Sequence, residues 1–255
     1  MACEFEGERT AIVTGGALRI GRAICRALAE DGWHLLIHCG HSVDEAKQLA
    51  GELGNARIVA ADLADPSAAG TIVAALDGLP PARLLVNNAS RFACDGADDF
   101  DLAGWDSHLD INLRAPALLS QAFARNAGGG GGLIVNLLDA KLASPNPDFF
   151  SYTVSKMGLA GLTELLARAW AARGIRVCGI APSVTLVSGP QSRANFDSVH
   201  RLNALGRGVD VAQVVGALRF IVATPTLTGQ TIVIDGGQRF LGLPRDVQFL
   251  EQKDG

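Results

Sequence analysis

A tyrosine and a lysine four residues apart are the side chains of this sequence best suited to proton transfer. Tyr152 is the only tyrosine in 255 residues that also contain ten phenylalanines, so its hydroxyl group is not explained by a need for bulk. Lys156 follows four residues later, and residues spaced in this way share one face of a helix. An ammonium group there favours the tyrosinate and is expected to lower the pKa of the phenol from its reference value of about 10. The pair is then a proton donor usable near neutral pH. The alternative is a half-buried tyrosine beside a solvated lysine.

An aspartate lies thirteen residues before the tyrosine, just after the predicted strand Leu133–Leu137. In a parallel sheet the end of a strand and the start of the next helix meet at one edge, so Asp139 and Tyr152 are expected to face each other. A strongly perturbed carboxyl at such an edge is typical of a functional site. The alternative is that Asp139 only caps a loop.

A fourth polar residue, Asn112, falls inside the predicted helix 102–126, where asparagine is a poor helix former. Two interpretations remain open from the sequence. Asn112 either holds a water that links Lys156 to solvent, or it simply disturbs the helix.

A glycine-containing turn, Thr14–Gly21, connects the first predicted strand to a helix. Such a turn lets backbone amides approach a pyrophosphate, which then lies at the positive end of the helix. Arg19 stands where a small glycine is expected, and its guanidinium can neutralise a pyrophosphate or reach a substrate lying over a nicotinamide. The alternative is a tight strand-to-helix connection. The residues of the turn predicted to contact a dinucleotide are Gly15, Arg19, Ile20 and Gly21.

The end of the second predicted strand indicates which dinucleotide is bound. Proteins that bind NAD place an acidic residue there to hold the ribose 2′-hydroxyl, but this chain has His41 and Ser42 and no acid before Asp44. A carboxylate would repel a 2′-phosphate, whereas a histidine, a serine and a helix amino terminus can hold one. NADP(H) is therefore predicted. The other interpretation is a surface loop in which Ser42 caps a helix.

Two further strand ends carry residues expected at the cofactor edge. Ligands of open parallel sheets lie at the carboxyl ends of the strands. The carboxylate of Asp62 can accept a hydrogen bond from an adenine amino group there. Taken singly, each of these groups is equally typical of a turn. The predicted residues are Asp62 and Leu63 after the third strand, and Asn88, Ala89 and Ser90 after the fourth.

Apolar, β-branched runs alternate with helical patterns along the whole chain. Single helices between buried strands predict a doubly wound α/β fold, with about seven parallel strands and helices on both faces. We predict one domain, 1–255, with a lid or binding loop at about 183–208. The predicted strands are Ala11–Val13, Leu35–His38, Ile58–Ala60, Leu84–Asn87, Leu133–Leu137, Ile175–Ile180 and Thr231–Ile234. The predicted helices are Arg19–Asp31, Val43–Leu53, Ser67–Leu76, Leu102–Asn126, Ser151–Arg173 and Val211–Ala223.

The composition excludes several classes of protein. Hydrophobic residues make up 48% and charged residues 19%, which excludes a disordered chain. The net charge of −4 argues against a nucleic-acid or anionic-membrane partner, and no apolar stretch has the length of a membrane helix. The first ten residues contain three glutamates and do not read as a signal peptide. Five cysteines without C-x-x-C spacing favour a reduced, cytoplasmic chain with no metal site.

These motifs together resemble the short-chain dehydrogenase/reductase family, from Thr10 to about Phe240. The resemblance implies a seven-stranded Rossmann-type sheet, a nicotinamide cofactor and usually a homotetramer. It implies that Tyr152, Lys156 and Asn112 are catalytic. The matching elements are Thr14–Gly21, Asp62, Asn87–Ala89, Asn112, Tyr152 with Lys156, Pro182–Ser183 and Asp235–Gly237, of which Pro182 and Ser183 are expected beside the cofactor.

Two residues that depart from the family pattern indicate which branch of the family this chain resembles. The family's serine is replaced by Asp139, and the middle glycine of the turn by Arg19. Together with the run Asn88–Phe92, they resemble pteridine reductases and bacterial dihydromonapterin reductases. That likeness implies that Phe92 stacks on a pterin, that Ser90 contacts pterin and cofactor, and that Arg19 lies near both. In pteridine reductases an arginine holds the 2′-phosphate where this chain has His41.

The chemistry of the aspartate supports this branch. An ionised carboxylate cannot donate a hydrogen bond to a ketone oxygen, so it suits a ketone reductase only if it is held neutral. It can accept from Tyr152 and relay a proton to a ring nitrogen. We therefore predict an NADPH-dependent pterin or dihydropterin reductase in which the substrate contacts are Arg19, Ser90, Phe92, Asp139 and Tyr152. The sequence leaves open the side chain and the oxidation level of the pterin.

Two other functions remain as alternatives. One is an NADPH-dependent reductase of ketones or 3-oxoacyl thioesters, and the other is a non-catalytic NADP(H)-binding redox sensor. Assembly is predicted separately, because the helix Tyr152–Trp170 is apolar or small on several sides. One sheet face cannot cover all of that surface, so a partner helix in a homo-oligomer is expected.

Overall fold

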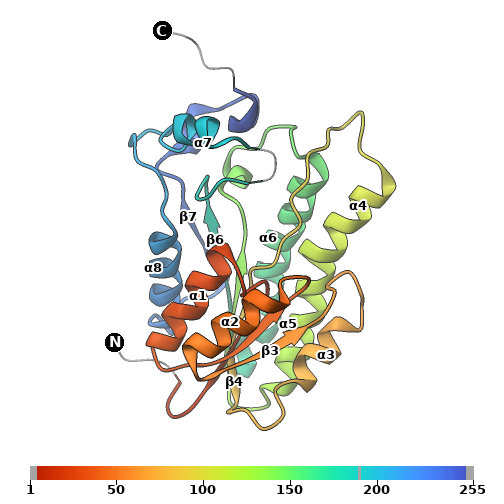
Figure 1. Ribbon diagram of the computed structural model, residues 1–255, viewed down its shortest axis with the longest axis vertical. Helices are drawn as coiled ribbons and strands as arrows, with labels where there is room; N and C mark the ends of the chain where they lie inside the picture. Colours follow the sequence, from red (N-terminus) through yellow and green to blue (C-terminus); the bar gives the residue numbers. More distant parts are fainter. Residues whose placement is uncertain (1–4, 189–190, 251–255) are drawn as a thin grey trace.

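The computed structural model describes residues 5–188 and 191–250, which form a seven-stranded parallel sheet flanked by helices (Figure 1). The strand order is β3-β2-β1-β4-β5-β6-β7, and each neighbouring pair is parallel. This confirms the predicted fold class. The strands are β1 Thr10–Val13, β2 His34–Cys39, β3 Ala56–Ala60, β4 Ala82–Asn87, β5 Gly132–Leu137, β6 Ile175–Pro182 and β7 Thr231–Ile234.

The sheet is buried on both faces by two layers of helices. Helices α1, α2 and α8 pack on one face, and α3, α5 and α6 pack on the other, while α4 packs against α6. Successive strand residues point to opposite faces, so Ala11 and Val13 belong to one core cluster and Ile12 to the other. The helices are α1 Arg19–Glu30, α2 Val43–Leu53, α3 Ala68–Ala74, α4 Leu102–Leu109, α5 Ala115–Asn126, α6 Phe150–Trp170, α7 Arg193–Val199 and α8 Val211–Val222.

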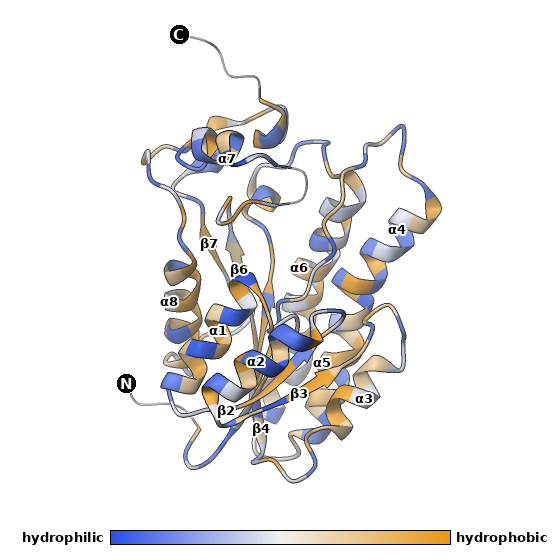
Figure 2. Cartoon of the chain, viewed as in Figure 1, coloured by the Kyte–Doolittle hydropathy of each residue, from blue (hydrophilic) through white to orange (hydrophobic). Residues whose placement is uncertain are grey.

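Hydropathy follows this layering. The strands are mostly hydrophobic along their length, whereas the outer helices carry both hydrophilic and hydrophobic positions (Figure 2). The described ranges contain no helix that is both long and apolar enough to cross a membrane.

The predicted helix 102–126 is wrong in one respect, because it is interrupted. A π-helical turn, Asp110–Arg114, separates α4 from α5 and contains the fully buried Asn112. Pro116 lies four residues after Asn112 and has no N–H to donate to the Asn112 carbonyl, so the regular α-helical bond cannot form there. Such π-turns are frequent at functional sites.

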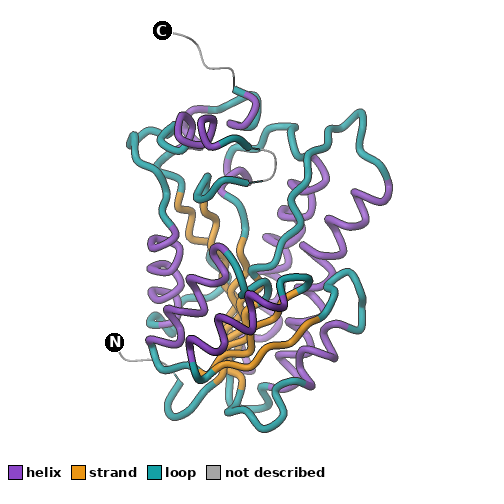
Figure 3. The backbone as a smooth tube through the Cα atoms, viewed as in Figure 1, coloured by secondary structure: helices purple, strands orange, loops and turns teal. Residues whose placement is uncertain are grey.

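Loops and short helices cover the carboxyl ends of the strands (Figure 3). Within the segment 183–208, expected to be irregular, residues Arg193–Val199 form α7, and the Ser192 hydroxyl caps it by accepting from Asn195 N at 3.1 Å. Residues 189–190 of that segment lie outside the described residues, as do 1–4 and 251–255 of the predicted domain. The lid function stays a prediction. The C-terminal residues 243–249, for which the sequence suggested no role, also lie beyond the strand ends.

Candidate active site

A cleft of about 490 Å³ lies at the carboxyl ends of the strands. This is the edge at which open parallel sheets bind ligands. It is lined by the glycine turn and by residues that follow β2, β4, β5 and β6, together with α6 and the C-terminal segment. Of the predicted site residues, those lining it are Gly15, Arg19, Ile20, Gly21, Ser42, Asn88, Ala89, Ser90, Phe92, Asp139, Tyr152, Lys156, Pro182 and Ser183.

The glycine turn has the geometry of a phosphate cradle. Gly15 has φ +60°, and a Cβ on Gly21 would lie 2.2 Å from the Gly15 carbonyl oxygen. No side chain fits at position 21, so the turn can close tightly over the start of α1. Asn88 Nδ2 holds the turn by donating to the carbonyl oxygens of Thr14 (2.8 Å) and Gly15 (3.1 Å). Backbone amides at a helix N-terminus fit the pyrophosphate of a dinucleotide, so these residues suit the predicted cofactor.

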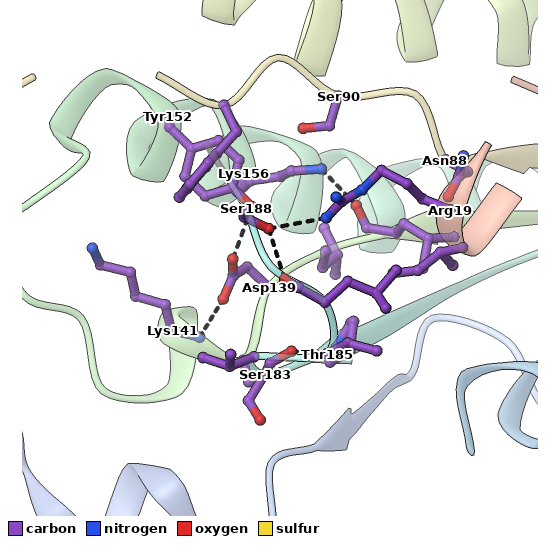
Figure 4. A pocket seen from close by; sticks show the side chains of 18 of the residues that line it. Arg19, Asn88, Ser90, Asp139, Lys141, Tyr152, Lys156, Ser183, Thr185 and Ser188 are labelled. Atoms are coloured by element: carbon purple, nitrogen blue, oxygen red, sulfur yellow. Dashed lines mark hydrogen bonds between the residues drawn. The ribbon is translucent and has the colours of Figure 1, made fainter. Parts of the chain in front are cut away.

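Arg19 adopts the backbone conformation that the family's glycine would favour. Its φ is +54°, which is uncommon for a residue with a side chain. The guanidinium reaches across the cleft, where Nη1 donates to Val187 O at 2.7 Å and Nη2 donates to Ser188 Oγ at 3.0 Å (Figure 4). Arg19 therefore joins the glycine turn to the segment after β6.

Of the two residues after β2 that were predicted to hold a 2′-phosphate, one lines the cleft and the other does not. Ser42 lines the cleft, together with Cys39 and Gly40, but His41 is exposed and does not line it. Asp62 and Leu63 do not reach the cleft either. Asp62 Oδ1 accepts from Ala64 N at 2.9 Å in a turn, and Leu63 is packed in the core. Both residues follow β3 at the same edge of the sheet, and their contact with the cofactor stays a prediction.

A buried histidine in β2, which the sequence motifs did not single out, supports the glycine turn. His38 Nδ1 accepts from Gly15 N at 3.2 Å, and Nε2 lies 3.0 Å from the Ala61 carbonyl oxygen. Since Nδ1 accepts and a carbonyl cannot donate, Nε2 carries the proton of a neutral ring. Burial lowers the pKa of His38, which favours that neutral form. A histidine that follows the apolar run Leu35–Ile37 is the sequence signal of this role.

Tyr152 and Asp139 meet in the cleft, as expected. The Tyr152 hydroxyl donates to Asp139 Oδ2 at 2.8 Å, and Asp139 Oδ1 accepts from Lys141 N at 2.8 Å. The second bond caps the 3₁₀ turn Ala140–Ala143. Asp139 therefore faces Tyr152 with one carboxylate oxygen and caps a turn with the other, so it does more than cap a loop.

The expected effect of Lys156 on the phenol is wrong for this structure. Burial raises the pKa of Tyr152 well above 10, and the Asp139 carboxylate raises it further. The Lys156 ammonium donates to the Leu137 carbonyl oxygen at 2.7 Å and lies 5.8 Å from the Tyr152 ring centroid. A carboxylate touching the hydroxyl therefore outweighs a cation that is held elsewhere.

Burial also shifts the other two members of this group. It lowers the pKa of Lys156 to about 8, against the opposing attraction of Asp139. It raises the pKa of Asp139, although hydrogen bonds from Lys141 N and the Tyr152 hydroxyl act in the opposite direction. An ammonium group and a carboxyl group whose pKa values are both shifted toward neutral pH are typical of acid–base sites.

The Asn112 amide joins the loop after β4 to α6. Its Oδ1 accepts from Arg91 N (2.8 Å) and from the Ser90 hydroxyl (3.1 Å), while Nδ2 donates to Arg91 O (3.0 Å) and Ser155 Oγ (3.0 Å). These four bonds use both protons and the oxygen of the amide. The Asn112 side chain therefore links the loop after β4 to α6, a role that neither interpretation from the sequence included.

Phe92 forms part of the cleft wall beside the tyrosine. Its ring meets the Tyr152 ring edge-on, with centroids 4.8 Å apart and planes at 85°. It also stacks on Phe149 at 4.3 Å and 19°. The wall is therefore flat, apolar and in contact with the Tyr152 ring.

A buried polar chain, also missed from the sequence, fixes the loop that carries Phe92. His108 Nε2 accepts from Ala93 N at 3.2 Å, and its Nδ1 lies 2.6 Å from the Ser151 hydroxyl. The Ser151 hydroxyl in turn donates to the Asp95 carboxylate. These partners come from α4, α6 and the loop after β4, so sequence spacing alone does not reveal them.

This fold and this site define the class of protein: the chain belongs to the short chain dehydrogenase family, whose model matches residues 9–196. It is accordingly an oxidoreductase.

Two curated relatives are named for polyol substrates. The D-threitol dehydrogenase of Mycolicibacterium smegmatis is 32% identical and is aligned over 90% of this chain and 92% of its own. The galactitol 2-dehydrogenase (L-tagatose-forming) of Cereibacter sphaeroides is 33% identical over 89% of this chain and 93% of its own.

Two solved structures are closer in sequence. Both are FolM alternative dihydrofolate reductase 1 crystallised with NADP, and both superpose with a TM-score of 0.87. The Brucella suis protein is 38% identical and covers 91% of this chain and 95% of its own. The Brucella canis protein is 37% identical and covers 96% of each.

Proposed function

We propose that this protein uses NADPH to reduce a pterin or dihydropterin, with Tyr152 and Asp139 delivering the proton. The observation that carries the proposal is the 2.8 Å hydrogen bond that the Tyr152 hydroxyl donates to Asp139. In this site a carboxyl group that can relay a proton stands where a simple carbonyl reductase is expected to have a hydroxyl donor.

Reduction of a C=N bond adds a hydride to carbon and a proton to nitrogen. When bound, NADPH supplies the hydride, and the chain must supply the proton. The raised pKa keeps the Tyr152 phenol protonated at neutral pH, and its proton is directed at Asp139, so delivery to a ring nitrogen passes through that carboxyl. Transfer of that proton to a ring nitrogen leaves a tyrosinate beside the Asp139 carboxylate, and the Lys156 ammonium, 5.8 Å from the tyrosine ring centroid, offsets the added negative charge.

The wall beside the donor suits a flat ring. Phe92 presents an aromatic surface adjoining Tyr152, while Ser90 and Arg19 line the same cleft with polar groups. The similarity to the two FolM alternative dihydrofolate reductases supports a pterin-type substrate.

NADPH is proposed for two reasons. The end of β2 carries no acid, and Ser42 lines the cleft there. His41 is the adjacent exposed side chain, and we retain it as a contact for the 2′-phosphate. The FolM relatives and a further solved structure, a blue fluorescent protein from a metagenomic library at 30% identity, hold NADP or NADPH.

The main competing function is a polyol dehydrogenase or carbonyl reductase. The names of the curated relatives favour it, and so does the raised pKa of Asp139, because a neutral carboxyl can donate to a ketone oxygen. Against it, both carboxyl oxygens of Asp139 already have partners within the chain, the Tyr152 hydroxyl and the Lys141 N–H. A non-catalytic NADP(H) sensor is the remaining alternative, and the presence of both Tyr152 and Lys156 in the cleft counts against it.

Assembly as a homotetramer is part of the proposal. On α6, Met157 is 44% exposed and Leu165 is 66% exposed, which leaves apolar surface that the sheet does not cover. A monomeric mass by light scattering at micromolar concentration would contradict this.

One assay separates the functions. Oxidation of NADPH is followed with dihydrobiopterin, with dihydrofolate, with a panel of ketones and without substrate, and NADP⁺ reduction is followed with threitol and galactitol. We expect turnover with a dihydropterin. Turnover confined to ketones or polyols would establish the competing function, and NADPH binding without turnover of any substrate would support the sensor.

A further inference from the structure

Three phenylalanines from distant parts of the chain form a continuous aromatic column. Phe92 stacks on Phe149 at 4.3 Å and 19°, and Phe149 stacks on Phe249 at 5.6 Å and 21°. The inner end of the column contacts Tyr152 edge-on. The outer end is Phe249, which is 38% exposed. The column thus runs from the proton donor to the surface of the C-terminal segment.

The middle member of the column has a strained backbone. Phe149 has φ +52°, although it is not a glycine, and it is only 1% exposed. It immediately precedes α6, the helix that carries Tyr152 and Lys156. A residue held in this conformation persists only where its surroundings fix it. The two stacked rings on either side of Phe149 supply that restraint.

Polar contacts hold the C-terminal segment against the same turn. The Arg245 guanidinium contacts both oxygens of Asp148 through Nε, at 2.9 and 2.8 Å, and the same carboxylate accepts from Asp246 N at 2.7 Å. The ammonium of Lys141 donates to Asp148 O and lies 3.4 Å from Asp246 Oδ2. The Asp148 side chain is only 12% exposed, whereas Arg245 is 54% exposed, so the carboxylate of this ion pair is shielded from solvent and the guanidinium is not.

The backbone on both sides of Phe92 is already fixed. Asn112 binds the N–H and carbonyl of Arg91, and His108 accepts from the N–H of Ala93. The remaining freedom of Phe92 is the orientation of its ring. Within the described chain, the ring that stacks on Phe92 is Phe149. The orientation of the Phe92 ring therefore depends on Phe149 and, through it, on Phe249.

We infer that residues 243–249 belong to the substrate site, and that Phe149 and Phe249 are positioning residues which orient Phe92 for a planar substrate. The identity of the substrate rests on the proposed function, but the orientation of Phe92 does not. Leu243, Arg245, Asp246, Val247 and Gln248 line the cleft directly.

The kinetic test compares two exposed phenylalanines of the C-terminal region. Phe249→Ala removes the outer ring of the column, and Phe240→Ala is the control. Like Phe249, Phe240 has an arginine guanidinium over its ring. Phe240 is 71% exposed, however, and stacks on no described ring. We expect Phe249→Ala to raise the KM of the dihydropterin roughly 2- to 12-fold, the range that corresponds to the loss of one aromatic pair. The Kd of NADPH should not change. Phe249→Trp should restore KM, and Phe240→Ala should match the parent protein.

A substrate-independent readout uses the single tyrosine of the chain. Tyrosine labelled with ¹³C at the ring carbon that bears the hydroxyl gives one resonance, from Tyr152, whose position depends on the adjacent Phe92 ring. The resonance should shift or broaden in Phe249→Ala and in Arg245→Met, and should be unchanged in Phe240→Ala.

These two readouts separate the inference from the proposed function. If the parent protein turned over no pterin while Phe249→Ala still moved the resonance, the proposed function would fail and the positioning role would hold. An unmoved resonance in both Phe249→Ala and Arg245→Met overturns the inference. A fall in melting temperature with equal effects on NADPH and substrate affinity also overturns it, because a merely structural role predicts that result.

Discussion

The hydroxyl of Tyr152 donates a 2.8 Å hydrogen bond to the carboxylate of Asp139, and the tyrosine is buried while Asp139 is partly buried. The other Asp139 oxygen is fixed by the backbone N–H of Lys141. Because both oxygens have partners, the carboxyl cannot rotate freely, and its lone pair is directed at the phenol. This fixed direction is what distinguishes the site from one in which a serine hydroxyl donates to a substrate.

Removing the phenol hydroxyl should stop the chemistry and spare the cofactor. Tyr152→Phe keeps the ring that contacts Phe92, so NADPH affinity measured by fluorescence should be close to that of the parent protein. Turnover should fall by roughly two to four orders of magnitude, the usual contribution of a positioned proton donor. A variant that retained more than a tenth of the parent turnover would show that another group delivers the proton.

Replacing the aspartate separates the two candidate substrate classes. Asp139→Ser removes the relay and introduces a hydroxyl that can donate to a ketone oxygen. We expect selective loss of dihydropterin turnover, with weak ketone turnover gained. The melting temperature of the same variant is the control, because Asp139 also caps the turn Ala140–Ala143. Unchanged dihydropterin turnover would refute the relay.

The activity should decline on the alkaline side of neutrality. Burial lowers the pKa of Lys156 to about 8, so its ammonium is charged below that pH and loses its charge as the pH rises through it. If the charge supports proton delivery by Tyr152, then kcat/KM should fall above about pH 8, since this ratio reports the free enzyme. Lys156→Arg, which stays charged in that range, should remove the alkaline limb even if its rate is lower. A profile that is flat from pH 7 to 9.5 in the parent protein would contradict the role given to Lys156.

Features set by local sequence could be predicted, and those set by distant contacts could not. The glycine turn, the strands and the Tyr152–Lys156 spacing are local, and the structure places them as expected. The direction of the Tyr152 pKa shift was predicted wrongly, because it depends on which charge touches the hydroxyl after folding. The supporting residue His38 was missed for the same reason: its partners, Gly15 and Ala61, are each 23 residues away.

The same limit applies to the interrupted helix and to the C-terminal segment. Pro116 was a local signal for the interruption of the helix, but the side-chain bonds of Asn112 to Arg91 and Ser155 join distant segments and are not encoded by helical periodicity. The docking of Phe249 against Phe149 joins residues a hundred positions apart. In a single sequence such pairs are visible only as ordinary aromatic residues near loops.

The last prediction concerns the cradle itself. A methyl group on Gly21 would lie 2.2 Å from the Gly15 carbonyl oxygen and 2.7 Å from Asn88 Nδ2, so Gly21→Ala must push the turn open. Loss of the close approach should weaken NADPH binding at least tenfold, or about 1.4 kcal/mol, while the remainder of the sheet stays folded. Gly51→Ala is the matched control, because Gly51 lies in α2 and a methyl group there would meet no atom within 4 Å. That control should bind NADPH normally and gain roughly 0.5–1 kcal/mol of stability, the usual difference between glycine and alanine inside a helix. Titration by fluorescence and thermal melting of both variants provide the test, and equal NADPH affinity in the two would show that the turn does not hold the cofactor.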